Sequence, residues 1–301
     1  MIVTRDHYVF GFANVDDNNP YALELLHSLE AAADKRDNIS LIIRDNGMDS
    51  NRAKANIETF MENNVDVIIM FHIDQRASQN LIFPIRLRRT PVLSIDIPIA
   101  GTRYFGINNE EVGRLAGQAL VRWIAEKWQG QIDHVVCVTE QRVLDFTHQR
   151  FEGVIAELER AFDLRPQNDV LYLDNGSSAD VTHQRMLELL QRWPEPHLVT
   201  ICINDSTARG VIRAVRETSR TQDVAIVSYD GTEVAFEAFA SKDIQFVTSP
   251  HISQRESGDA ILDLCIRLAK NEMVNPRTYV PTVQLTWENR REYGQHLEGD
   301  A

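Results

Sequence analysis

Short apolar runs alternate with amphipathic helical segments along the whole chain, and this alternation constrains the fold more than any other feature of the sequence. The runs are rich in Val and Ile and lack a polar–apolar alternation, which is typical of strands covered on both faces. They are YVFGFA (8–13), ISLII (39–43), VDVIIMF (65–71), PVLSID (91–96), HVVCVT (134–139), DVLYLD (169–174), LVTICI (198–203), VAIVSYD (224–230) and IQFVTS (244–249). Strand, helix and strand at this spacing indicate right-handed βαβ units, so we predict an α/β protein built on doubly wound parallel sheets.

The pattern occurs twice. One series of strand–helix units runs to about Asp96, the short run YFGI (104–107) leads into a long helix, and a second series runs to about residue 250. Each series contains a polar, Asn-containing turn that opens a helix, and each contains an apolar strand that ends on an aspartate, VLSIDIP and IVSYDGT. We therefore predict two similar lobes rather than one long sheet, and 301 residues suffice for two domains of about 150 residues.

Composition and motifs exclude several classes of function. A net charge of −13 without a basic run argues against a polyanionic partner, so we expect no nucleic-acid contact by this chain. Cys137, Cys202 and Cys265 lie far apart inside apolar runs, so buried free thiols are expected. No phosphate-binding loop, dinucleotide fingerprint, nucleophile elbow or metal-ligand motif occurs in the sequence. We expect no catalytic residues, no metal and no cofactor.

Polar side chains gather where the predicted strands end, which is where open α/β sheets bind ligands. Carboxylates, amides and a guanidinium suit the vicinal hydroxyls of a sugar, because they accept and donate hydrogen bonds in forked pairs. The aromatic rings of Tyr21 and Phe71 are candidates to cover the apolar face of such a ring. The candidate hydrogen-bonding residues are Asn19, Asp96, Arg150, Asn204 and Asp230.

A second interpretation applies to each of these residues. Asp and Asn at strand ends are preferred helix caps, and Arg150 can pair with a structural carboxylate. For any single residue a cap is as good an explanation as a ligand contact. The repetition of the pattern in both halves favours a binding site.

At these residues the sequence resembles the type I periplasmic binding proteins of the ribose- and galactose-binding kind, the solute receptors of bacterial ABC importers. The segments that carry the resemblance run in order along nearly the whole chain. They are VDDNNPYALELLHSLEAAADKR, NVDVIIMF, PVLSIDIP, YFGINNEEVGRLAGQAL, HQRFEGV, CINDSTARG, VSYDGTEVAFEAF, VTSPHISQRESGDAIL and the closing strand YVPTVQLTWENRREY.

The resemblance implies two lobes joined by a three-strand hinge around a central cleft that closes on its ligand. The lobes would comprise residues 1–107 plus 251–281 and residues 108–250 plus 282–301, with crossovers near residues 107, 250 and 282. Asn19, Asp96, Arg150, Asn204 and Asp230 match positions that hydrogen-bond sugar hydroxyls, Tyr21 matches a ring-stacking position, and His251 falls close to a polar ligand position.

The chain departs from the ribose-binding pattern in its first lobe. Val15 replaces a residue that is often polar, Phe71 replaces an amide, and Ile97 replaces an arginine. These changes favour a deoxy, methylated, cyclitol or otherwise less polar ligand over a plain pentose.

The implied function is a monomeric, non-enzymatic solute-binding protein that captures a monosaccharide, cyclitol or related polyol and delivers it to the membrane subunits of an ABC permease. Such a protein is periplasmic or extracytoplasmic after removal of a signal peptide. The alternative is the effector-binding core of a LacI-type regulator, which would be cytoplasmic, or a receptor sensor domain. Because the first strand begins near residue 7, we expect no DNA-binding headpiece within this chain.

Overall fold

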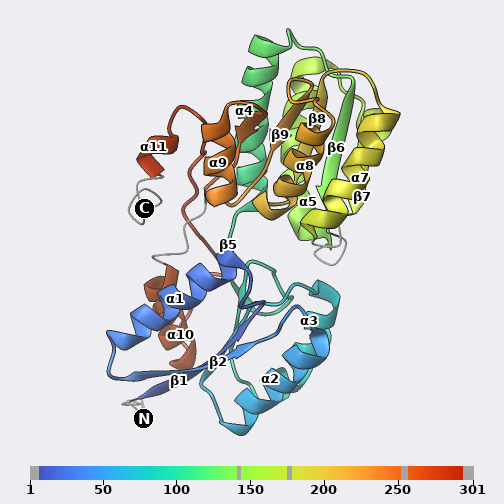
Figure 1. The fold of residues 1–301 in the computed structure, drawn as a ribbon. Helices are drawn as coiled ribbons and strands as arrows, with labels where there is room; N and C mark the ends of the chain where they lie inside the picture. Colours follow the sequence, from blue (N-terminus) through green and yellow to red (C-terminus); the bar gives the residue numbers. More distant parts are fainter. Residues whose placement is uncertain (1–6, 141–143, 175–177, 252–256, 294–301) are drawn as a thin grey trace. The chain divides into compact units, whose positions relative to one another are not determined.

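The computed structural model describes residues 7–140, 144–174, 178–251 and 257–293 (Figure 1). The chain divides into two compact units, Met1–Ile107 with Ser253–Pro281 and Asn108–Ile252 with Thr282–Ala301. Each unit contains one parallel sheet with helices on both faces. The predicted fold class, an α/β protein with doubly wound parallel sheets, is therefore confirmed.

The first unit is built on a six-stranded parallel sheet in the order β11-β5-β4-β3-β1-β2. Figure 1 shows α1 and α10 on one face of this sheet and α2 and α3 on the other. The strands are β1 (Tyr8–Asn14), β2 (Ile39–Asp45), β3 (Val67–Met70), β4 (Val92–Ile95), β5 (Arg103–Gly106) and β11 (Arg277–Tyr279). The helices are α1 (Pro20–Asp34), α2 (Ser50–Glu62), α3 (Gln75–Leu87) and α10 (Ser257–Ala269).

The second unit repeats the plan with five parallel strands in the order β10-β9-β8-β6-β7. Helices α4 and α5 pack together, as do α7 and α8. The strands are β6 (His134–Thr139), β7 (Val170–Asp174), β8 (Leu198–Cys202), β9 (Val224–Val227) and β10 (Gln245–Thr248). The helices are α4 (Asn109–Lys127), α5 (Leu144–Phe162), α6 (Pro166–Asp169), α7 (Ala179–Arg192), α8 (Asp205–Glu217), α9 (Glu233–Ser241) and α11 (Arg290–Tyr293).

Several helices begin at polar capping residues, and their apolar faces pack against the sheets. Asn19, Asp49 and Asp74 accept hydrogen bonds from the first turns of α1, α2 and α3, and Ser178 does the same for α7. The core of the second unit packs α7, α8 and α9 against strands of the sheet, and that of the first packs α2 and α3 in the same way. This burial of apolar surface is the main favourable term in folding.

The structure differs from the predictions at the edges of the sheets. Strand β7, expected to be covered on both faces, is partly exposed, with Tyr172 45% exposed, because β7 is the last strand of its sheet. The predicted closing strand over residues 279–293 is mostly irregular. Its principal pairing is a single antiparallel bridge between Val283 and His251, and residues 290–293 form α11. The predicted crossover near residue 250 continues into residues 252–256, which lie outside the described residues.

Within the described part of the chain, no helix combines the length and the apolar character needed to cross a membrane.

Candidate functional site

The candidate residues of the first unit follow three adjacent strands, β4, β3 and β1. Asp96 follows β4, Phe71 follows β3, and Asn19 and Tyr21 lie at the start of α1, after β1. The chain leaves β1 toward β2 on one side and returns to β3 on the other, so the order of the strands reverses between β1 and β3. Ligands bind at such a switch point in open α/β sheets. We call Asn19, Tyr21, Phe71 and Asp96 the first-unit set.

Asp96 has a backbone conformation that few residues adopt. Its φ is 55°, and the N–H of Ile97 donates to the carbonyl of Ile95 at 2.6 Å, so Asp96 is the centre of a γ-turn of the rare, strained kind. No helix follows directly, since β5 is the next element. The helix-cap interpretation therefore does not apply to Asp96, and strained backbone of this kind is concentrated at ligand sites.

Gly106 makes room for the Asp96 carboxylate. Gly106 has a φ of +155°, and a Cβ at this position would lie 2.3 Å from Asp96 Oδ1 and 2.8 Å from the Tyr104 hydroxyl oxygen. Asp96 itself is 8% exposed. The end of β5 is thus shaped around a buried acid.

Asn19 does act as a helix cap. Its Oδ1 accepts from the N–H of Ala22 at 3.1 Å, so the cap interpretation holds for this residue. A capping amide still carries an NH₂ group that can donate to a ligand. Tyr21 lies in the first turn of α1, and its ring meets the ring of Phe71 edge to face, with centroids 6.5 Å apart. The two aromatic residues predicted to cover a sugar ring therefore lie together.

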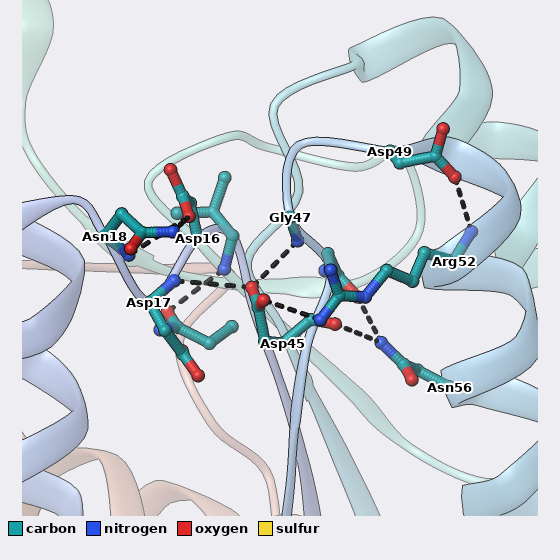
Figure 2. Close-up of polar contacts among 11 residues, drawn as sticks. Asp16, Asp17, Asn18, Asp45, Gly47, Asp49, Arg52 and Asn56 are labelled. Carbon is teal, nitrogen blue, oxygen red and sulfur yellow. Dashed lines mark hydrogen bonds and ion pairs between the residues drawn. The ribbon is translucent and has the colours of Figure 1, made fainter.

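Acidic residues after β1 and at the end of β2 hold a loop in place (Figure 2). Asp16 accepts from the backbone N–H of Asn18, and Asp45 accepts from the N–H groups of Asp17 and Gly47. Asp45 also pairs with Arg52 at 2.7 Å. The Asp17 carboxylate accepts from the side-chain amide of Asn14 at 2.7 Å. These contacts explain Asp16, Asp17 and Asp45 as structural residues that fix the approach to α1.

The candidate residues of the second unit occupy equivalent places in its sheet. Asp230 follows β9, Asn204 follows β8, and Arg150 lies in α5, the helix after β6. Strands β9, β8 and β6 are adjacent, and the strand order reverses between β6 and β8. We call Arg150, Asn204, Asp230 and His251 the second-unit set. Both units therefore present their candidate residues at the same topological position.

Arg150 is held by several partners. Its Nε donates to Asn109 Oδ1 at 2.7 Å, its Nη1 donates to the Ile203 carbonyl at 2.6 Å, and its guanidinium lies over the Tyr229 ring at 5.0 Å from the centroid. Its Nη1 is also 3.8 Å from Asp230 Oδ1. The side chains of Arg150 and Asp230 are 8% and 15% exposed. A cation and an anion fixed at this depth can each form charge-assisted hydrogen bonds, which are stronger than neutral ones.

Asp230 is not a helix cap. The N-cap of α9 is Thr232, which makes no capping hydrogen bond with its side chain. Asp230 has a φ of 101° and is followed by Gly231, with a φ of 64°. A Cβ on Gly231 would lie 2.6 Å from the Cα of His251, so only glycine fits here. The turn thus brings a carboxylate beside Arg150 at the cost of an unusual backbone.

Asn204 caps α8, and the next residue, Asp205, donates a backbone hydrogen bond to Tyr229, the residue before Asp230. The Asn204 Oδ1 accepts from the N–H of Thr207 at 2.9 Å, so for Asn204, as for Asn19, the cap interpretation holds. His251 forms an isolated parallel bridge with Asp230, and its Nδ1 lies 3.0 Å from the Gly231 carbonyl. Its ring contacts those of Phe236 and Tyr293. His251 thus packs against the turn that carries Asp230.

Three residues that support this site are outside the predicted ligand-binding set. Asn109 accepts from Arg150, the Tyr229 hydroxyl donates to the Arg150 carbonyl at 3.1 Å, and the buried Asp205 accepts hydrogen bonds from the Asp230 turn and the end of β10. Burial raises the pKa of the Tyr229 hydroxyl, which therefore stays protonated and able to donate. The asparagine pair in YFGINNEE and the aspartate in CINDSTARG were visible, but nothing in their spacing gives their partners.

Each set offers groups that suit an uncharged polyhydroxylated ligand. The first-unit set has one acid, one amide and two rings that meet edge to face, and the second-unit set has one acid, one amide, one guanidinium and one imidazole. Among the described residues, no group of three or more His, Cys, Asp or Glu side chains is placed to hold a metal ion.

A protein-family model and curated sequences match most of this chain. The family model described as "Periplasmic binding protein domain" matches residues 10–273. The chain is 24% identical over 285 residues to the ribose operon repressor of Escherichia coli, covering 93% of this chain and 79% of the repressor. It is 24% identical over 286 residues to a candidate rhizopine-binding protein of Rhizobium meliloti, covering 89% of this chain and 87% of that protein.

Solved structures share the fold. An ABC transporter solute-binding protein from Bacillus halodurans with bound myo-inositol superposes with a TM-score of 0.82 at 17% identity, covering 97% of this chain and 98% of the other. The arabinose-binding component of an ABC transporter from Shewanella, bound to L-arabinofuranose, gives 0.80 at 19% identity, covering 97% and 99%. A solute-binding protein from Actinobacillus succinogenes with bound D-allose gives 0.80 at 17% identity, covering 95% and 100%.

Proposed function

Because this chain belongs to the periplasmic binding protein family, we propose that it is a solute receptor that binds one monosaccharide, cyclitol or related polyol between its two units. In this proposal the first-unit set and the second-unit set face one shared cleft, and the units close over the ligand by hinge bending. The unit of residues 1–107 with 253–281 and the unit of residues 108–252 with 282–301 act as the two lobes. The receptor binds its ligand without chemical turnover.

The observation that carries the proposal is the pair of aspartates Asp96 and Asp230. Each follows a central parallel strand of its unit, each has a positive φ, and neither caps a helix. The helix-cap interpretation is thus removed for both acids. Hydroxyl groups of one ligand would explain their equivalent places, since a carboxylate accepts two hydroxyl protons.

The ligand class follows from the side chains around these acids. Phe71, Ile97 and Val15 follow strands of the first unit where the ribose-binding pattern has polar side chains, so the strand ends of this unit are less polar than in that pattern. A deoxy or methylated sugar leaves fewer hydroxyl groups without a partner beside such side chains than a plain pentose does. Structural relatives with bound myo-inositol, D-allose and L-arabinofuranose support the proposal that the ligand is a monosaccharide or cyclitol.

Delivery to an ABC permease and a periplasmic or other extracytoplasmic location complete the proposal. Binding shifts the protein toward its closed state only as far as the ligand prefers that state, and the permease would recognise the closed surface. We infer a monomer, since one chain contains both lobes.

A thermal-shift screen tests the function. Monosaccharides, cyclitols and related polyols at millimolar concentration are added to the protein, and a ligand at 100 times its Kd stabilises the folded state by about 2.7 kcal/mol. We expect a clear rise in Tm for one polyol class and none for nucleotides or amino acids. A rise only with another class of solute would contradict the proposal.

The second candidate is the effector-binding core of a transcriptional regulator. The 24% identity to the ribose operon repressor favours it, and the core of such a regulator would also bind a sugar. The codons upstream in the native gene distinguish the two functions, because a secretion leader indicates a receptor and a helix-turn-helix segment indicates a regulator.

A further inference from the structure

Asp205 is the most deeply buried carboxylate near the site. It is fully buried at the start of α8, directly after Asn204. Burying a carboxylate is unfavourable unless hydrogen bonds compensate it. Burial raises the pKa of Asp205, while hydrogen bonds from Thr232 and Ser249 oppose that rise. The position of this acid therefore requires an explanation.

Three hydrogen bonds hold the Asp205 carboxylate in one small network. Its Oδ2 accepts from the N–H of Thr232 at 2.7 Å and from the Thr232 hydroxyl at 3.0 Å. Its Oδ1 accepts from the Ser249 hydroxyl at 2.7 Å. Ser249 Oγ in turn accepts from the N–H of Gly231 at 3.0 Å. The network thus holds both residues that follow Asp230 in the chain.

The Thr232 side chain takes part in this network although Thr232 is at a helix-capping position. Thr232 is the N-cap of α9, but its side chain bonds to Asp205 instead of capping its own helix. The backbone N–H of Asp205 donates to the carbonyl of Tyr229 at 2.9 Å, and Tyr229 is the residue before Asp230. Asp205 therefore contacts the chain on both sides of Asp230.

We propose that Asp205 is a positioning residue for the ligand site: it clamps Tyr229 and Thr232 so that Asp230 keeps its positive φ and its carboxylate stays beside Arg150. This inference rests on the proposed function for the role of Asp230, but the clamp itself acts in the ligand-free protein. Without it, the turn relaxes toward ordinary backbone angles and the carboxylate leaves Arg150. The positive φ of Asp230 is unfavourable for a non-glycine residue and persists only where its surroundings impose it.

The test uses variants that change single atoms of the network. Asp205→Asn replaces one accepting oxygen by a donor, and Thr232→Val replaces the hydroxyl of a half-buried residue by a methyl group. Thr232→Ser keeps the hydroxyl and serves as the conservative rescue. Val215→Ala, in the fully buried core face of the same helix, is the control for lost stability alone.

Two measurements are made on each full-length variant. Hydrogen exchange of the Gly231 and Thr232 amides in the ligand-free protein reports on the clamp. Calorimetric titration with myo-inositol, D-ribose and D-allose reports on binding. For Asp205→Asn and Thr232→Val we expect faster exchange at these two amides than in Val215→Ala, and affinity for the bound polyol lower by about tenfold, the loss of one hydrogen bond of roughly 1.4 kcal/mol. Thr232→Ser should match the wild type in both.

The outcomes separate the two proposals. If wild-type protein binds none of the three polyols, the proposed function loses its support, and the exchange rates still decide whether the clamp exists. If polyol binding is normal and exchange at Gly231 and Thr232 changes no more than in Val215→Ala, the positioning role is wrong. If Asp205→Asn does not fold, Thr232→Val and Thr232→Ser decide the question, because Thr232 is only partly buried.

Discussion

Arg150 and Asp230, from a helix after β6 and a turn after β9, meet with Nη1 and Oδ1 3.8 Å apart. The guanidinium is also fixed by Asn109 and by the Ile203 carbonyl, so its position does not depend on Asp230. The Arg150 guanidinium is therefore held in place by contacts other than its attraction to the Asp230 carboxylate. Its geometry leads to the first prediction.

Asn109 supports Arg150 through its oxygen. Asn109→Leu removes the acceptor of the Arg150 Nε–H and leaves a buried donor without its partner, which costs about 1–3 kcal/mol. We expect a matching loss in the free energy of unfolding and weaker polyol binding, measured by urea denaturation and calorimetry. Asn109→Asp keeps an accepting oxygen and is the matched control. Wild-type affinity in Asn109→Leu would show that Arg150 needs no such support.

Gly106 is predicted to be required for the position of Asp96. Gly106→Ala places a Cβ 2.3 Å from Asp96 Oδ1, so the carboxylate must move. Gly130→Ala is the control, because Gly130 also has a positive φ, +85°, but a Cβ there lies 3.4 Å from Phe162. Both should lose about 1–2 kcal/mol from backbone strain, and only Gly106→Ala should lose polyol binding as well. Equal binding by the two variants would remove Asp96 from the site.

The sequence predicted the sheets and most of the strands because buried parallel strands are short, apolar and rich in β-branched residues. The run HVVCVT coincides with β6, and YVFGFA with all but the last residue of β1. The second interpretation of the polar residues was right for Asn19 and Asn204, which are caps, and does not apply to Asp96 and Asp230. A cap and a strained ligand turn look alike in sequence, since both place Asp or Asn after a strand. Only the backbone angles separate them.

The supporting residues could not be predicted in the same way. Asn109 precedes Arg150 by a whole helix and a strand, and Asp205 reaches Ser249 across two further strands. Such contacts depend on the heights of loops above the sheet and on rotamers. The resemblance implies a closing strand over residues 279–293, but beyond Tyr279 the described residues of this segment form one isolated bridge instead of a continuous ladder.

The Arg216–Asp243 pair gives a pH dependence. Two hydrogen bonds from Arg216 lower the pKa of Asp243 to about 2. A carboxyl whose pKa is lowered by folding stabilises the protein above its unfolded pKa, near 4, and this stability is lost as the pH falls toward 2. Because both side chains are nearly half exposed, the contribution is about 0.5 kcal/mol.

Denaturation of wild type and Asp243→Asn from pH 6 to pH 3 measures this effect. The wild type should be the more stable protein at pH 6, and the difference should shrink steadily toward pH 3. A difference that is constant with pH would mean that the ion pair does not contribute through charge.

The three cysteines should be inert in the native protein. Cys137, Cys202 and Cys265 are fully buried free thiols, as predicted, and burial raises the pKa of each. Since the thiolate is the reactive form, a disulfide reagent such as dithionitrobenzoate should modify native protein very slowly and all three thiols after unfolding in guanidinium. Rapid reaction of one equivalent with native protein would show an accessible thiol.

The most direct test of the account asks whether acids from both units bind the same ligand. Calorimetric titration with the polyol identified by thermal shift is made on wild type, Asp96→Asn and Asp230→Asn, variants that keep the side-chain shape and tolerate a positive φ. The account predicts one ligand per chain, and a loss of affinity of about 30- to 100-fold in each variant, the size of one charge-assisted hydrogen bond of roughly 2–3 kcal/mol. If either variant binds the polyol as tightly as wild type, the ligand does not lie between the two acids.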